Sequence, residues 1–456
     1  MFENIRHIYF LGIGGIGMSA LAKYFHGRGI RISGYDKTPS ELTDEMIASG
    51  MSIHFEDNVE LVPADIDLVV ITPAIPADHK EWKQLRDRGL PIRKRAEVLG
   101  MISGDAVCLA VAGTHGKTTT TTMLTHLLKS SNVNCTAFLG GIAANFMTNY
   151  VAGDPKLVVV EADEYDRSFL HLSPTGAIIT SVDADHLDIY GDHSHVTESY
   201  KAFAEKVKDN GTLVLKNGID PGLNENYRAR IRVRNYGVNT SLNGSSNIRV
   251  QNGSFVFDYK GERESISDLR LSVPGRHNVE NATAAITLAL EFGATAEGVR
   301  NGIGSFKGVH RRFEYALKTD SHVVVDDYAH HPEELKAAIS AARELYPDKK
   351  ITGVFQPHLF SRTRDFADQF ARSLEMLDTV ILLEIYPARE LPIPGITSSM
   401  LLGKINGPDK FLCAKEELVS LIEKNNPEVT LIMGAGDIDR LVKPVVNALK
   451  GKEGRS

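Results

Sequence analysis

Short hydrophobic runs recur along the whole chain, and most are separated by stretches in which apolar residues have helical spacing. The ten clearest runs are continuously hydrophobic rather than alternating, which is typical of strands in a parallel sheet buried on both faces. Their alternation with helical segments predicts an α/β fold. The runs are HIYFLGIG, IRISGYD, DLVVITPA, VCLAVAG, LVVVEAD, AIITSVD, HVVVDDYA, ITGVFQPH, TVILLEIY and VTLIMGAGD.

The length of 456 residues is too great for one hydrophobic core, so we expect two or three domains. One boundary is expected near MISGDAV and another near HRRFEYALKTD, where a fresh strand follows a helical stretch. Between residues 213 and 273 the short strands lie among Asn and Gly, which predicts a β-rich excursion inside the middle domain. We therefore expect domains at residues 1–104, 105–313 and 314–456.

Charge and cysteine content narrow the class of protein. The net charge of −7 leaves no basic field that would indicate nucleic acid as a partner. The three cysteines are far apart and form no CxxC, which favours a reducing cytosol over a disulfide framework or a zinc site. The N-terminus is not typical of a signal peptide. The chain contains no run of 18 apolar residues, so the sequence does not predict a membrane-spanning helix. We expect a cytoplasmic protein.

The segment AVAGTHGKTTTTTML, residues 110–124, joins a hydrophobic strand to a glycine turn and a helix. Gly113 and Gly116 allow backbone N–H groups to turn toward an anion, Lys117 can reach the outer phosphates of a nucleotide, and Thr118 can bind magnesium. The strict phosphate-loop pattern has glycine where this chain has Val111, so the loop is a shortened relative. The alternative is an ordinary strand-to-helix turn with an exposed lysine.

Acidic residues follow the next two strands. Because carboxyl ends of parallel strands meet at one edge of a sheet, these residues are expected beside the phosphate loop, where they could hold a metal ion with ATP. The candidates are Glu161, Asp163, Glu164, Asp166, Asp183, Asp185, His186 and Asp188.

A second glycine loop, LGIGGIGMSA, follows the first strand and contains Gly12, Gly14, Gly15 and Gly17, and Asp36 ends the second strand. This spacing fits the dinucleotide fingerprint, in which a diphosphate meets a helix N-terminus and an acid binds a ribose. NAD and a UDP-sugar satisfy the same geometry, so both remain open.

The last third of the chain contains two dense groups of titratable residues. Asp326, Asp327, His330 and His331 follow one strand, although paired histidines before Pro332 could also cap a helix. Arginines at i and i+2 at the end of the next strand suit capture of a carboxylate or phosphate. That group comprises His358, Arg362 and Arg364.

These motifs together resemble the Mur ligases of peptidoglycan synthesis, and most closely the branch that attaches L-alanine to UDP-N-acetylmuramate. They occur in family order from Gly12 to Asp437 and therefore cover almost the whole chain. The matching segments are GIGGIGMSALA, AGTHGKTTTT, EADEYDRSFLHL, ADHLDIYGD, PGRHNVENATAA, GVHRRFE, DDYAHHP, FQPHLFSRTRDF, PIPG and MGAGD.

The resemblance implies a Rossmann-like N-terminal domain for the UDP-sugar, a central P-loop ATPase-type domain with a mixed sheet, and a Rossmann-like C-terminal domain for the amino acid. The implied substrates are UDP-N-acetylmuramate, L-alanine and ATP with Mg2+, and the implied assembly is a monomer or weak homodimer. A murein tripeptide ligase of the same family is the alternative because EADEYD is similar to that branch. A more distant alternative is an NAD-binding oxidoreductase.

The resemblance also assigns roles to residues at matching positions. The implied ATP contacts are Gly113, Thr114, His115, Gly116, Lys117, Thr118, Thr119, Asn278, Asn281, Arg312 and Asp327. The implied metal ligands are Thr118, Glu161 and His186. The implied UDP-sugar contacts are Gly14, Gly15, Ile16, Asp36, Thr72, Ala74, His115 and Asn145. The implied amino-acid contacts are Tyr328, His330, His331, His358, Arg362 and Arg364. The residues expected to act in catalysis are Lys117, His186, His331 and Arg364.

Overall fold

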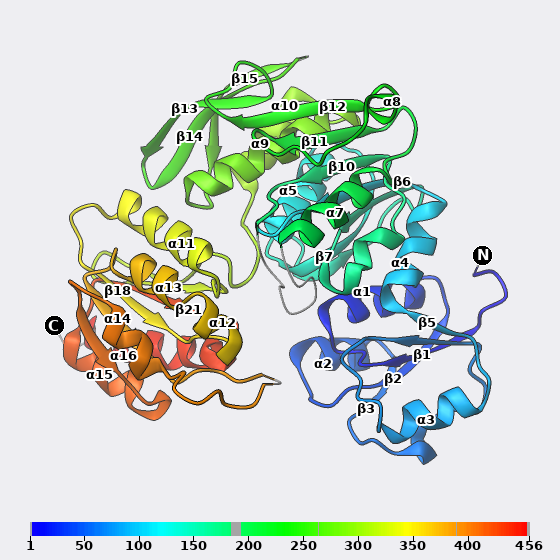
Figure 1. The fold of residues 1–456 in the computed structure, drawn as a ribbon, viewed down its shortest axis with the longest axis horizontal. Coiled ribbons are helices and arrows are strands. Elements are labelled where there is room, and N and C mark those ends of the chain that lie inside the picture. The colour runs from blue at the N-terminus through cyan, green and yellow to red at the C-terminus, as the bar shows by residue number, and fades with distance from the viewer. Residues whose placement is uncertain (1, 184–192, 263, 389, 454–456) are drawn as a thin grey trace. The chain divides into compact units, whose positions relative to one another are not determined.

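The computed structural model describes residues 2–183, 193–262, 264–388 and 390–453, and three β-sheets organise them (Figure 1). The chain forms two compact units. The first comprises residues 1–246, 258–269 and 280–306, and the second comprises residues 247–257, 270–279 and 307–456. All ten strands expected from the hydrophobic runs are present, which confirms the α/β fold.

The N-terminal sheet lies in the first unit and has the strand order β3-β2-β1-β4-β5, with every pair parallel. All five residues of β1 are buried. Ile8 and Phe10 enter one hydrophobic cluster, whereas Tyr9 and Leu11 enter another, so both faces of the strand are covered as predicted. The elements are β1 (His7–Leu11), α1 (Ile16–His26), β2 (Arg31–Tyr35), α2 (Glu41–Ala48), β3 (Ser52–His54), β4 (Leu68–Ile71), α3 (Lys80–Asp87), β5 (Ile92–Lys94) and α4 (Arg95–Gly104).

The central sheet has ten strands in the order β15-β14-β13-β12-β11-β10-β6-β9-β7-β8. Pairs from β11 to β7 are parallel, and the edge pair β7–β8 is antiparallel, so the sheet is mixed as expected. The excursion predicted between residues 213 and 273 is confirmed by β12 to β15. The elements are β6 (Val107–Ala112), α5 (Lys117–Ser130), β7 (Thr136–Ala143), β8 (Thr148–Val151), β9 (Leu157–Glu161), η2 (Tyr165–His171), β10 (Gly176–Ile179), α7 (His193–Ala204), β11 (Thr212–Lys216), α8 (Glu225–Arg228), β12 (Arg232–Val238), β13 (Gly244–Gln251), β14 (Ser254–Lys260), β15 (Ser265–Leu271), α9 (Arg276–Glu291) and α10 (Ala296–Ser305).

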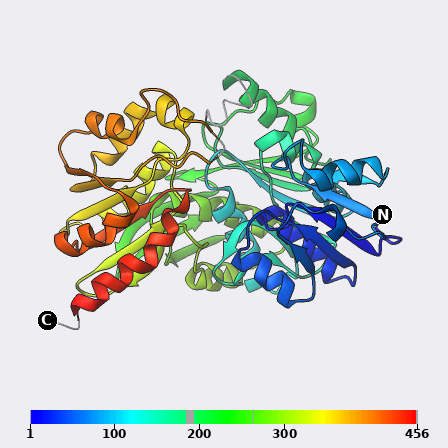
Figure 2. The ribbon, with the colours of Figure 1, turned by 90° about the horizontal axis from the view of Figure 1, so that it is seen from below.

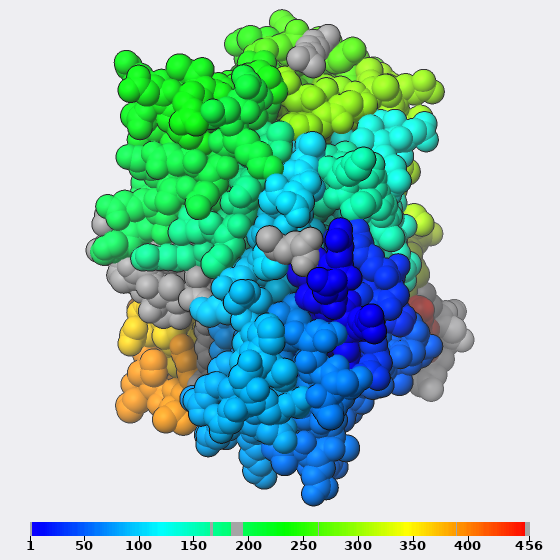
Figure 3. All heavy atoms as spheres, turned by 90° about the vertical axis from the view of Figure 1, so that its right-hand side faces the viewer, coloured from blue at the N-terminus to red at the C-terminus, as the bar shows by residue number. Residues whose placement is uncertain are grey.

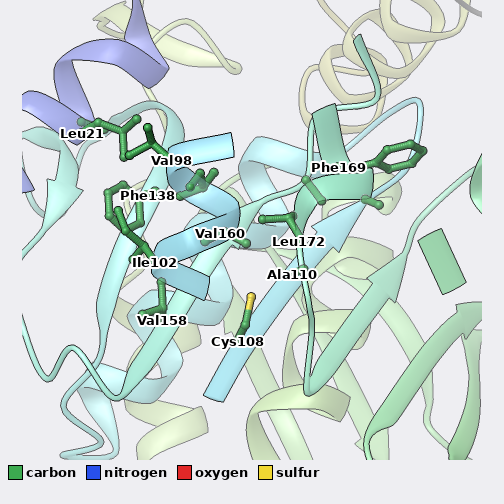
Figure 4. Close-up of a cluster of buried hydrophobic side chains, with 14 of the residues drawn as sticks. Leu21, Val98, Ile102, Cys108, Ala110, Phe138, Val158, Val160, Phe169 and Leu172 are labelled. Carbon is green, nitrogen blue, oxygen red and sulfur yellow. The ribbon is translucent and has the colours of Figure 1, made fainter. Parts of the chain in front are cut away.

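One continuous core joins the N-terminal sheet to the central sheet. Leu21 of α1 and Val98 of α4 belong to the same buried cluster as Cys108 of β6 and Val160 of β9 (Figure 4). On the face shown in Figure 3, N-terminal residues (blue) adjoin residues of the central segment (cyan and green). The two parts therefore share apolar packing rather than only a linker.

The C-terminal sheet lies in the second unit, in the order β16-β17-β21-β18-β19-β20. Only β16 is antiparallel to its neighbour among these pairs. Helices cover both of its faces, with α16 (red) along one of them (Figure 2). The elements are β16 (Glu314–Lys318), β17 (Val323–Asp327), α11 (Pro332–Leu345), β18 (Ile351–Phe355), α12 (Phe360–Asp365), α13 (Ala367–Leu374), β19 (Thr379–Leu382), α14 (Ser398–Lys404), β20 (Asp409–Leu412), α15 (Leu418–Asn425), β21 (Val429–Met433) and α16 (Val442–Glu453).

Within the described ranges, no helix combines the length and the apolar character that a bilayer crossing requires.

Candidate active site

The turn between β6 and α5 has the backbone shape that a phosphate loop needs. Gly116 is the N-cap of α5 with φ +79°, and Gly113 has φ +136°, a region that L side chains rarely adopt. A Cβ at Gly113 would overlap the hydroxyl of Thr180. Helix α5 then begins at Lys117, so its free N–H groups face the turn, as an anion site at a helix N-terminus requires.

Lys117 is held inside this turn. Its ammonium donates to the carbonyl oxygen of Gly113 at 2.7 Å and to Glu164 Oε1 at 2.8 Å, and its side chain is 14% exposed. The alternative of an exposed lysine is therefore wrong. Burial alone would lower the pKa of Lys117, but the carboxylates of Glu164 and Glu161 raise it above its usual value.

The end of β10 supports the other side of the turn. The backbone N–H of His115 donates to Ser181 Oγ at 2.9 Å, and the hydroxyls of Thr114 and Ser181 are 2.7 Å apart. Asp183 closes the group, because its backbone N–H donates to Thr114 Oγ1 at 3.1 Å. Ser181 was not among the predicted site residues, although its place at the end of a buried strand beside the loop was a usable signal.

The acidic end of β9 reaches the same region. Thr118 and Thr119 at the start of α5 are buried. The Glu161 carboxylate packs directly against Gly140, where a Cβ would overlap it. Asp163 forms an ion pair with Arg95 at 3.2 Å, and Arg95 was not among the predicted site residues. Three of the acidic-segment candidates, Asp185, His186 and Asp188, lie outside the described residues.

The two asparagines expected at the nucleotide are both at the start of α9. Asn281 lies against the phosphate loop, because a Cβ on Gly116 would be 2.6 Å from Asn281 Oδ1. Asn278 is buried and donates to the carbonyl oxygen of Pro274 at 2.6 Å. Their assignment to adenine stays a prediction.

The first glycine loop also lies between a strand and a helix. The N–H of Gly14 donates to Asp36 Oδ2 at 2.7 Å, so the acid at the end of β2 binds the loop backbone. Gly15 is the N-cap of α1, whose first residue is Ile16. On the neighbouring strand end, a Cβ at Gly12 would be 2.5 Å from Thr72 Cγ2, and Ala74 follows two residues later.

Asn145 follows β7 and is engaged by another part of the first unit. Its Nδ2 donates to the carbonyl oxygen of Ser305 at 2.8 Å. Its expected place beside the sugar stays a prediction.

In the second unit, buried acids lie at the end of β17. Burial raises the pKa of Asp326 to about 6 and that of Asp327 to about 6, and Arg311 and Arg312 oppose these shifts. Asp327 accepts from the N–H groups of Phe313 and Ala329, each at 2.8 Å. Arg312 also lies over the ring of Tyr328, at 5.2 Å from its centroid.

The histidines beyond β17 have structural partners. His331 is the N-cap of α11, and Glu334 accepts from its N–H at 3.3 Å, which confirms the helix-cap alternative for this residue. His330 Nδ1 lies 2.9 Å from the carbonyl oxygen of Tyr328, and its ring is 5.9 Å from that of His358. Burial lowers the pKa of His330, which favours the neutral ring.

The placement of the arginines differs from the prediction. Arg362 and Arg364 were expected at a strand end, but both lie in the short helix α12. Residues two apart in a helix point roughly 160° away from each other. Arg364 is 53% exposed and pairs with Asp365 at 2.7 Å, so the two guanidinium groups do not form one fork.

Family models match three successive segments of the chain, in the same order as its three sheets. Three family models match in order: "Mur ligase family, catalytic domain" at residues 7–106, "Mur ligase middle domain" at 111–289 and "Mur ligase, glutamate ligase domain" at 311–436.

Full-length relatives agree with the family models. The UDP-N-acetylmuramate–L-alanine ligase of Flavobacterium psychrophilum is 49% identical over 99% of both chains. The crystal structure of a UDP-N-acetylmuramate-alanine ligase from Thermotoga maritima matches with a TM-score of 0.82, at 29% identity over 98% of this chain and 99% of that one. A murein peptide ligase from Psychrobacter arcticus shares the fold, with a TM-score of 0.72 and 22% identity over 97% and 98% of the two chains. The chain belongs to the Mur ligase family.

Proposed function

We propose that this protein is an ATP-dependent ligase that joins L-alanine to the lactyl carboxylate of UDP-N-acetylmuramate, a step in peptidoglycan precursor synthesis. The observation that carries the proposal is the turn around Lys117, which has phosphate-loop geometry in a chain similar end to end to ligases of that name. The reaction yields UDP-N-acetylmuramoyl-L-alanine, ADP and phosphate.

The chemistry explains the need for ATP. A carboxylate is a poor electrophile, so ATP phosphorylates it to an acyl phosphate, the alanine amine attacks the carbonyl carbon, and phosphate leaves. Catalysis is then positioning and neutralisation of phosphate charge. Lys117 supplies a cation at the turn, and the N–H groups at the start of α5 supply fixed donors.

The chain's residues fit Mg2+ at the nucleotide. Thr118 and Glu161 would hold the ion, with His186 as a third group, and Mg2+ would neutralise phosphate charge when bound. The support is chemical: Mg2+ typically uses one or two protein oxygens together with substrate phosphates.

Each of the three expected domains is proposed to bind a different substrate. Residues 1–104 hold the UDP-sugar through the loop at Gly14 and Asp36, residues 105–313 hold ATP, and residues 314–456 hold L-alanine. The residues proposed around alanine and the acyl phosphate are Tyr328, His330, His331, His358, Arg362 and Arg364. The enzyme acts in the cytoplasm as a monomer or weak homodimer.

Phosphate release tests this function. The protein is assayed with ATP, Mg2+ and UDP-N-acetylmuramate against L-alanine, glycine, L-serine and the murein tripeptide. Turnover with L-alanine is expected to dominate. Dominant turnover with the tripeptide would instead assign the recycling activity, and fluorescent titration with NAD is expected to show no binding.

A further inference from the structure

Helix α4 connects the N-terminal sheet to the central sheet and is packed against both. Gly100 in α4 lies so close to η2 that a Cβ would be 2.5 Å from the carbonyl oxygen of His171. Val98 and Ile102 of the same helix enter the core shared with the central sheet (Figure 4). The first residue of α4, Arg95, is therefore held between the two parts of the first unit.

The Arg95 side chain touches one element from each part. On the N-terminal side it lies against Gly17 in the first turn of α1, where a Cβ would be 2.9 Å from Arg95 Cδ and 3.0 Å from its Nη1. On the central side its Nη2 is 3.2 Å from Asp163 Oδ2. One side chain thus connects the glycine-loop helix to the acidic strand end beside the phosphate loop.

Gly17 has a role here that its motif did not indicate. Its φ is not positive, so the backbone does not require glycine, and glycine weakens a helix relative to alanine. What the position gains from glycine is room for the guanidinium of Arg95.

The Arg95–Asp163 pair is only partly buried, so we expect it to contribute modestly to stability. The Arg95 side chain is 19% exposed and that of Asp163 is 39% exposed, and solvent-accessible ion pairs typically contribute about 1 kcal/mol or less to folding. The three acids at the end of β9 have different contacts: Asp163 pairs with Arg95, whereas Glu164 pairs with Lys117 and Glu161 packs against Gly140. The arginine pair therefore points to positioning.

A second set of polar contacts joins the central sheet to helix α1. Asn149 of β8 is fully buried and donates to the carbonyl oxygen of Ile16 at 2.6 Å and to Ser19 Oγ at 2.8 Å. Central-sheet residues thus hold the first turns of α1 at two points, Asn149 and Asp163 through Arg95.

We propose that Arg95 is a positioning residue that sets the distance between the glycine loop and the phosphate loop, with Asp163 as its anchor rather than a metal ligand. This proposal rests on the proposed function, because one substrate must reach from the sugar-nucleotide loop to the phosphate loop. A misplacement near 1 Å can reduce a rate by about 100-fold even when binding is preserved.

The test compares Arg95→Gln, Asp163→Asn, Gly17→Ala and the Gly17→Ala/Arg95→Gln double variant in the full-length protein. We expect Arg95→Gln and Asp163→Asn each to lower kcat by about 10- to 100-fold. The Kd of UDP-N-acetylmuramate, measured by calorimetry, should stay within about threefold, since the loop's own contacts remain. The Mg2+ dependence of Asp163→Asn should match the wild type. Arg86→Gln, at an exposed arginine paired with Asp87, is the matched control.

Gly17→Ala separates positioning from a purely structural role. Alanine favours the helix, so the melting temperature should hold or rise, while displacement of Arg95 lowers kcat by about three- to tenfold. In the Arg95→Gln background, Gly17→Ala should not lower kcat further, because the guanidinium that alanine would displace is absent. A wild-type kcat for Arg95→Gln, additive effects in the double variant, or a shifted Mg2+ dependence in Asp163→Asn would overturn the proposal. An Arg95→Gln defect with an intact Asp163→Asn enzyme would do the same, by assigning Arg95 to direct substrate contact. Absence of alanine-dependent turnover by the wild type would count against the proposed function instead.

Discussion

Removal of the Lys117 ammonium should damage both activity and folding. Lys117 is 14% exposed and Glu164 is 3% exposed, so Lys117→Ala leaves an acid in the interior without the cation 2.8 Å from it. Breaking a buried pair costs about 3–5 kcal/mol, and the partial exposure of the lysine reduces this to roughly 2–4 kcal/mol. Loss of one electrostatic contact to transferring phosphate should lower kcat by about 100- to 1,000-fold.

The two effects can be separated with a second substitution. Lys117→Ala/Glu164→Gln also removes the charge of the acid that has lost its cation, so it should recover most of the lost free energy of unfolding but none of the activity. Urea unfolding followed by circular dichroism and phosphate release measure the two quantities. Lys129→Ala, on the same helix and with neutral hydrogen-bond partners, is the control. A Lys117→Ala protein as stable as the wild type, or a double variant no more stable than the single one, would refute this reasoning.

Four further predictions address other parts of the site. Glu161→Gln should shift activity to higher Mg2+ concentration, and an unchanged Mg2+ titration would remove it from the metal site. Asp36→Ala deprives the Gly14 N–H of its 2.7 Å acceptor, so calorimetry should show UDP-N-acetylmuramate binding weakened by about tenfold, with the alanine KM spared. Arg364→Ala should raise the alanine KM without changing unfolding, because the side chain is 53% exposed; loss of sugar-nucleotide binding would contradict this. The pKa of Asp326 is raised from 3.8 to about 6, so the folded state holds the proton more tightly, and the ionised carboxylate destabilises the fold increasingly from about pH 4 to 6 and fully above. Asp326→Asn should therefore be more stable than the wild type at pH 7.5, by up to about 3 kcal/mol, but not at pH 4. A difference in the free energy of unfolding that does not change with pH would contradict the assignment.

Sequence pattern was a reliable guide to the strands buried on both faces. Runs such as VCLAVAG become β6, whose last five residues are all buried, because a parallel strand covered on both faces accommodates continuous apolar residues. Half-exposed strands were harder to locate individually. In β13 the sequence GSSNIRVQ is mostly exposed beyond its first two residues, and in β20 all four residues are exposed, so hydrophobicity carries little signal.

In the candidate site, features set by adjacent residues were predictable, whereas contacts between distant segments were not. The backbone turn at Gly113 and Gly116 and the start of α5 at Lys117 follow from adjacent residues, and both were predictable. Partners from other segments were not: Glu164 for Lys117 lies 47 residues away, and Arg95 and Asp163 are 68 residues apart. The alternative of an exposed Lys117 is wrong for this reason, since only the fold places an acid beside the lysine.

The glycines of the two loops show why the motif is informative and yet incomplete. At several of them, the space left by the missing Cβ is taken by a polar side chain from elsewhere in the chain. A glycine motif therefore marks positions where backbone must be approached closely, but it does not say whether a ligand or the protein itself approaches. The pairs are Gly14 with Asp36, Gly17 with Arg95, Gly113 with Thr180, and Gly116 with Asn281. Substitution of these glycines thus perturbs a network of side chains as well as a turn, and a loss of activity at any one of them is evidence for a ligand contact only after its side-chain partner has been tested too.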